Sequence, residues 1–184
     1  MCFASNGENV LRARVPDPEL IHRSLMGSSG HKENILKPEF DEAGIGMGSS
    51  SDGMYFVTQD FIKSVPVREE AEVRAIVQAA LDSFREGRGL APLRVVDEVQ
   101  GTARIFALAR SAGRETPPIP ESFGETRVHF YAGPDLEAIV GSLAEIPVDH
   151  YRIAGVGVRF ARTAGYSGGA YFVCVFFLVG DPPR

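Results

Sequence analysis

The fold of the first third of the chain depends on residues 24–36, which read SLMGSSGHKENIL. Just upstream, Asp17 can cap a helix whose first residue is Pro18, because a proline at that position has no N–H to leave unpaired. The sequence therefore predicts a short helix over residues 18–27. The glycines and serines at 27–30 predict that this helix ends in a turn that carries His31.

Two apolar segments follow and predict an antiparallel hairpin. Residues 43–47 read AGIGM and residues 54–62 read MYFVTQDFI, and the loop between them is rich in Ser, Asp and Gly. This loop ends in Asp52 and Gly53. Both residue types are common in turns, because an Asp side chain can bond the nearby backbone and Gly accepts a positive φ. The first 63 residues thus contain a helix followed by a hairpin.

The rest of the chain predicts helices and strands in alternation. Apolar residues recur at helical spacing over residues 69–84, which indicates one buried stripe. The final apolar segment has almost no polar alternation, which predicts a strand buried on both faces. The further predicted elements are a helix capped by Asp97 and ending near Gly113, a strand at 127–131, a helix capped by Asp135, and strands at 153–160 and 170–179. The fold class is therefore α+β, with helices covering antiparallel sheets.

Four short matches in one order indicate an internal duplication. The second copy lacks seven residues relative to the first, in the region of residues 30–34 around His31. In order, the matched segments are 5–9 with 122–126, 17–25 with 135–143, 44–46 with 155–157, and 53–57 with 169–173. A repeat of helix and hairpin units is the expected result.

Composition excludes several classes of protein. The 184 residues include 24 acidic and 19 basic side chains, a net charge of -5, without a Lys or Arg run that could follow a phosphate backbone, so nucleic acid is not an expected partner. The chain has no apolar run of the ~20 residues that span a bilayer, and the given residues contain no signal peptide. Cys2 and Cys174 show neither metal-ligand spacing nor a disulfide framework, and a bridge between them stays open.

The motifs together resemble a known family. They are GENV at residues 7–10, the stretch 24–36 with its GHKENIL, GIG at 44–46, and YFVTQDF at 55–61. This set resembles the bacterial branch of the CAP superfamily, which comprises the cysteine-rich secretory, antigen 5 and pathogenesis-related proteins. The resemblance implies a three-layer α-β-α sandwich with an antiparallel sheet, and an extracellular or cell-surface location.

The resemblance also implies a domain organisation. Residues 1–65 resemble the C-terminal half of a CAP-like domain, and residues 69–180 resemble one degenerate CAP-like domain. The family's opening helices and strand are absent ahead of Met1, so we expect a tandem whose first copy is truncated. Residues 1–65 would then have an uncovered sheet face, which is marginal in water, so they are expected to pack on the second copy or to form a homodimer.

The resemblance places a polar site at Glu8 and His31. A carboxylate and an imidazole could activate a water or bind a divalent metal such as zinc, with His31 as ligand, but zinc sites usually take three or four protein ligands. The alternatives are structural. Glu8 could brace a turn, the His31 ring could bond the backbone of its own loop, Asn34 could tie the loop to the helix end, and Gln59 could be a buried amide instead of a ligand-binding group.

Two functions follow as hypotheses. The first is a secreted or surface module without catalysis, which binds a small ligand or a protein partner through Glu8, His31, Asn34 and Gln59, with no firmly assigned cofactor. The second is a metal-dependent, peptidase-like hydrolase in which Glu8 and His31 are catalytic. The second copy has lost the loop that carries His31, so we expect it to be a packing or binding module.

Overall fold

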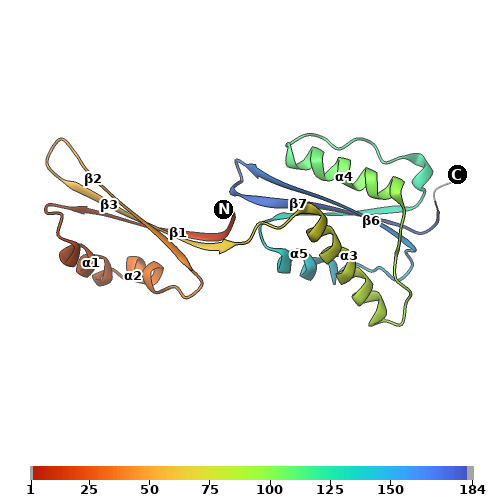
Figure 1. Ribbon diagram of the computed structural model, residues 1–184, viewed down its shortest axis with the longest axis horizontal. Coiled ribbons are helices and arrows are strands. Elements are labelled where there is room, and N and C mark those ends of the chain that lie inside the picture. Colours follow the sequence, from red (N-terminus) through yellow and green to blue (C-terminus); the bar gives the residue numbers. More distant parts are fainter. Residues whose placement is uncertain (1, 182–184) are drawn as a thin grey trace. The chain divides into compact units, whose positions relative to one another are not determined.

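A computed structural model describes residues 2–181 of the chain and has an α+β fold (Figure 1). The chain divides into two compact units. Unit 1 is Phe3–Pro66, and unit 2 begins at Val67 and also includes Cys2. Among residues 2–181, no helix is long and apolar enough to cross a membrane.

Unit 1 is a three-stranded sheet with two helices on one side (Figure 1). Its strands lie in the order β1-β3-β2. The predicted hairpin is confirmed, because β2 and β3 pair antiparallel with Gly46 opposite Thr58. The elements of unit 1 are β1 (Cys2–Ala13), α1 (Pro18–Gly27), α2 (Ser29–Leu36), β2 (Glu42–Ser49) and β3 (Tyr55–Val65).

Helix α1 begins and ends where the sequence predicts. The Asp17 carboxylate accepts hydrogen bonds from the backbone N–H groups of Glu19 and Leu20, at 2.9 and 3.2 Å, which satisfies two donors at the open end of the helix. The helix ends at Gly27, and its Leu25 side chain is fully buried against the sheet. Burial of this one side chain therefore holds α1 in place.

Unit 2 is a four-stranded sheet covered on both faces. The strand order is β4-β6-β7-β5, with β4 parallel to β6 and the other pairs antiparallel. Helices α3 and α5 lie on one side of the sheet and α4 on the other (Figure 1). The elements are α3 (Glu70–Glu86), β4 (Arg94–Val95), α4 (Asp97–Ser111), the short 3-10 helix η1 (Glu121–Phe123), β5 (Thr126–Gly133), α5 (Leu136–Leu143), β6 (Ile153–Thr163) and β7 (Tyr166–Leu178).

Strand β7 is the centre of the core of unit 2. Residues 168–178 are all buried, which confirms the prediction of burial on both faces. On one face, Val173 and Val175 pack with Val77 of α3 and its neighbours. On the other face Phe176 contacts Phe106 of α4, with ring centroids 4.8 Å apart in an edge-to-face arrangement. The helices thus bury the sheet on each side.

Helix α4 lies unusually close to β6, and two glycines allow this. A Cβ added at Gly155 would lie 2.6 Å from the backbone of Val99, and one added at Gly157 would lie 2.0 Å from the carbonyl oxygen of Ala103. Real Cβ atoms do not approach other atoms so closely, so neither position accepts a side chain without moving α4. Glycine within a strand often marks such a close approach of another backbone.

Two predictions about local structure are wrong. Val96, not Asp97, is the cap residue of α4, and Asp97 lies in its first turn, where its negative charge favours the helix N-terminus. Segment 5–9 lies within strand β1, whereas its predicted match at 122–126 ends η1 and passes through Gly124 at a φ of 59°. The first of the four repeat matches therefore joins unlike backbone conformations.

Cys174 lies in β7 beneath α4 and is a free thiol. Burial raises its pKa to about 12, because an apolar environment disfavours the thiolate. The bridge to Cys2 that the sequence left open is not formed.

Candidate functional site

His31 lies in the first turns of helix α2. This differs from the predicted glycine-serine turn, because Ser28 is the only non-helical residue between α1 and α2. The His31 ring is partly buried, and its Nδ1 atom is buried with no hydrogen-bond partner among the described residues. The structure therefore does not contain a hydrogen bond from Nδ1 by which the His31 ring would fix its own loop.

A network of amides joins α2 to the sheet instead. Asn9, buried in β1, donates from Nδ2 to the His31 carbonyl oxygen at 3.0 Å and to Gln59 Oε1 at 3.1 Å. Asn34 of α2 donates to Asn9 Oδ1 at 2.9 Å and to the Glu8 carbonyl oxygen at 3.1 Å. These bonds satisfy polar groups that are costly to bury unpaired, so the network fixes α2 against β1 and β3.

Of the four predicted site residues, the structure brings together His31, Asn34 and Gln59 but separates the Glu8 side chain from them. Side chains alternate along a strand, and Asn9 points toward α2. Glu8 therefore points to the opposite face of the sheet. Its side chain is exposed within β1, and no described residue bonds to its carboxylate, so it does not brace a turn.

Zinc does not fit the residues described. His31 could offer its buried Nδ1 atom to a metal, because this atom has no hydrogen-bond partner among the described residues. The Glu8 carboxylate, which was expected beside it, lies on the other face of the sheet. Within residues 2–181 no group of three or more His, Cys, Asp or Glu side chains is placed to hold a metal ion. Protein zinc sites use three or four such ligands. No catalytic step through a metal follows from this geometry.

A hollow beside the amide network is the more distinctive feature of this face. It has a volume of about 300 Å³ and lies between α1 and the hairpin. Ile45 and Met47 line it and are 74% and 59% exposed, although they point to the same side of the sheet as α1. The other lining residues are Pro16, Pro18, Ile21, His22, Leu25, Val57 and Gln59. A mostly apolar hollow with an amide at one edge suits an apolar group that also offers a polar contact.

Residue-by-residue motif reasoning missed Ile45 and Met47. The available signal was the alternation of apolar residues with glycine in β2, which marks one apolar face of a strand. Only one short helix, over residues 18–27, was predicted within residues 1–65 to cover that face. The two facts together could have identified the hollow.

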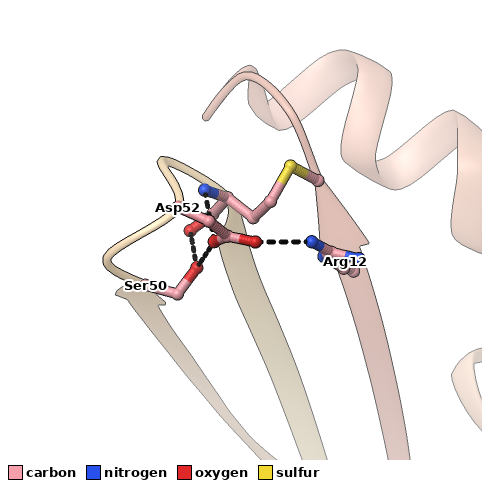
Figure 2. A network of polar contacts seen from close by, with 4 residues as sticks. Arg12, Ser50 and Asp52 are labelled. Atoms are coloured by element: carbon pink, nitrogen blue, oxygen red, sulfur yellow. Dashed lines mark hydrogen bonds and ion pairs between the residues drawn. The ribbon is translucent and has the colours of Figure 1, made fainter.

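The opposite face of unit 1 is held by a different set of contacts (Figure 2). Arg12 of β1 pairs with Asp52 in the β2–β3 turn at 2.7 Å, and its guanidinium lies 5.9 Å from the centre of the Phe56 ring. The pKa of Asp52 is held below its usual range, mainly because its carboxylate accepts hydrogen bonds from Ser50 and from the Met54 N–H. The hydrogen bond from Arg12 lowers this pKa further. Arg12 is therefore already paired on the face to which Glu8 points.

Comparison with known proteins gives distant structural likenesses. No protein-family model matches the chain, and no curated protein matches it. The chain is similar to an outer surface protein from Borrelia burgdorferi, with 17% identity and a TM-score of 0.45 over 60% of this chain and 96% of that one. It is also similar to a cysteine-rich secretory protein from Staphylococcus aureus, with 12% identity and a TM-score of 0.42. That match covers 79% of this chain and 59% of the other.

Proposed function

We propose that this chain is a CAP-like module of the secreted or surface type that binds an apolar segment of a protein partner through the hollow of unit 1. The GEN and GHKENIL motifs at residues 7–9 and 30–36 support the family and, with it, the location. The observation that carries the binding function is the exposure of Ile45 and Met47 over the hollow. Apolar side chains exposed in a contiguous patch mark interaction surfaces.

The strand arrangement supports treating the units as two copies of one domain. Unit 1 has the order β1-β3-β2, and unit 2 has the same order in β5-β7-β6. The pairing also corresponds. Gly46 pairs with Thr58, and Gly157 pairs with Cys174. The repeat equates the two glycines, and Thr58 and Cys174 directly follow its last matched segments, 53–57 and 169–173. The proposed duplication therefore assigns each residue of the β2–β3 hairpin a counterpart in β6 and β7.

These counterparts suggest what the hollow accepts. Ile45 corresponds to Val156 and Met47 to Val158, and both valines are buried in the cluster that contains Val77 of α3. In unit 2, α3 thus covers the surface that corresponds to the hollow. We infer that the partner segment is an amphipathic helix, whose apolar side chains fill the hollow as those of α3 fill the equivalent space.

The test uses a helix of known sequence as a probe. A peptide of residues 69–87, stapled between positions 75 and 79 on its exposed side, is titrated into the full chain and followed by fluorescence anisotropy. We expect saturable binding that Met47→Glu weakens about tenfold or more, because a carboxylate in an apolar hollow is desolvated without a partner. Met47 is exposed, so the substitution should leave the fold intact.

Val10→Glu is the matched control. Val10 is also an exposed apolar residue of unit 1, at 48%, but it lies on the face of β1 to which Glu8 points. Binding should be unchanged by this variant. Absence of binding, or equal loss with Val10→Glu and Met47→Glu, would contradict the proposal.

A further inference from the structure

The sheet of unit 2 is covered less completely on the α4 side than on the other side. Opposite α4, helix α5 lies against strand β5, where His129 Nε2 is 3.3 Å from the Ser142 hydroxyl. On the α4 side, Val128 and Phe130 of β5 pack at the margin of the apolar cluster and are only partly buried. Residues 114–120, which have no regular structure, lie there in place of a second helix. An apolar area of the sheet therefore stays open at β5.

A pocket of about 420 Å³ fills this open area and is called the aromatic pocket below. Phe106 of α4 and Phe130 of β5 line it with their rings, and Pro117, Pro118 and Ile119 form another part of its wall. Ile119 is 40% exposed, so this wall has apolar surface available for contact. Small-molecule sites are concave, mainly apolar and roughly 300–1,000 Å³ in volume. Because Phe and Pro rings present flat faces, the pocket suits a flat apolar ring.

Arg110 supplies the charge of the aromatic pocket. It lies in the last turn of α4, and its guanidinium carbon is 4.7 Å from the centre of the Phe130 ring, which holds the cation over the ring face. Among residues 2–181, no Asp or Glu lines the pocket or pairs with Arg110. Cys174 also lines the pocket, and burial raises the pKa of its thiol to about 12, so it stays neutral. The pocket thus combines an apolar interior with an uncompensated cation.

We propose that the aromatic pocket binds a small aromatic carboxylate. The ring of this ligand packs among Phe106, Pro117 and Pro118, and its carboxylate accepts two parallel N–H bonds from Arg110. A guanidinium matches a carboxylate in this way, and such charge-assisted pairs are stronger than neutral hydrogen bonds. The contact with Phe130 orients the guanidinium before the ligand arrives, which reduces the entropy that binding costs. The pocket lies within unit 2, so this inference stands apart from the function proposed for unit 1.

The experiment titrates 2-naphthoate, which joins two fused rings to a carboxylate, into the full chain and measures the heat of binding. We expect saturable binding that Arg110→Gln weakens about tenfold or more, because the paired charge is lost. The neutral amide, 2-naphthamide, should bind the unaltered chain as weakly as 2-naphthoate binds Arg110→Gln. Arg110 is exposed, so thermal unfolding of this variant should stay close to that of the unaltered chain.

Arg104→Gln is the matched control. Arg104 is another exposed arginine of α4, but it lines a different hollow, beside β6, and its loss should leave binding unchanged. Ile119→Glu tests the apolar wall and should weaken 2-naphthoate about tenfold or more, because it brings a second negative charge to the pocket.

Decanoate tests the ring, because it places the same carboxylate on a flexible chain. It should bind more weakly than 2-naphthoate, since ordering the chain costs entropy. Absence of 2-naphthoate binding, or equal loss with Arg104→Gln and Arg110→Gln, overturns the proposal. Binding of 2-naphthamide or decanoate as tight as that of 2-naphthoate also overturns it, because the carboxylate or the ring would then not be what the pocket recognises.

Discussion

Gly46 of β2 and Gly157 of β6 are counterparts in the proposed duplication, but their surroundings are opposite. A Cβ at Gly46 would meet open space, whereas one at Gly157 would lie 2.0 Å from the Ala103 carbonyl oxygen. The difference is the helical cover: unit 2 has α3 and α4 on its two faces, and the described residues of unit 1 include no counterpart of either helix. The strand pattern alone therefore does not say whether a sheet is covered.

The two units also differ in how they fix the centre of the sheet. In unit 2, Val175 of β7 is fully buried in an apolar cluster. In the proposed duplication its counterpart in unit 1 is Gln59, which accepts a hydrogen bond from Asn9 at 3.1 Å. Unit 1 thus uses directed amide bonds where unit 2 uses packed hydrocarbon, which suits a sheet with less apolar surface to bury.

Gly157→Ala should have the largest effect. The new methyl group would collide with backbone atoms of α4, which cannot rotate away as a side chain could, so α4 must shift from β6. We expect a loss of about 3 kcal/mol in the free energy of unfolding of unit 2. Hydrogen exchange by mass spectrometry, read over α4, β6 and β7, measures this separately from unit 1.

Gly46→Ala is the matched control for that experiment. The same methyl group meets nothing within 4 Å in unit 1, so exchange in β2 and β3 should be unchanged or slower. If both alanine variants destabilise their units equally, the correspondence between the two glycines is wrong. If neither alanine substitution destabilises its unit, α4 does not need a glycine at position 157.

Asn9→Ala should have an intermediate effect, confined to unit 1. The substitution removes the amide that bonds Gln59 and Asn34 and leaves the His31 carbonyl without its side-chain donor. We expect a loss of about 2 kcal/mol, because buried polar groups are left unsatisfied. Faster hydrogen exchange over α2 would report it, with exchange in β7 unchanged. An unaltered α2 would show that the network does not hold this helix.

Much of the fold follows from sequence pattern. The apolar stripe of residues 69–84 gives α3, and alternation with a Gly-containing loop gives the β2–β3 hairpin. The cap at Asp17 gives the first residue of α1. These features depend on neighbours in the sequence, which is why pattern alone identifies them.

The site was harder to predict, for two physical reasons. Helix α2 begins at Ser29 despite its serine and glycine, because intrinsic propensity is weak and Asn34 ties the helix to Asn9 of a distant strand. The direction of the Glu8 side chain depends on strand alternation in β1, since a shift of one residue moves a side chain to the other face. A motif fixes which residues are present, but not which side of the sheet each side chain takes.

The smallest expected effect separates two helix caps that the proposed duplication equates, Asp17 of α1 and Asp135 of α5. Asp17 accepts two backbone N–H groups and Asp135 one, from Glu137 at 2.9 Å. Asp17→Ala should cost about 1 kcal/mol and raise exchange in the first turn of α1 roughly fivefold. Asp135→Ala should have a smaller effect, because α5 buries Ile139 and Leu143 whereas α1 buries Leu25 alone. Packing then holds α5 after its cap is lost. A larger effect at Asp135 would mean that α5 depends on its cap more than on its buried side chains, and the expected difference between the two caps would be wrong.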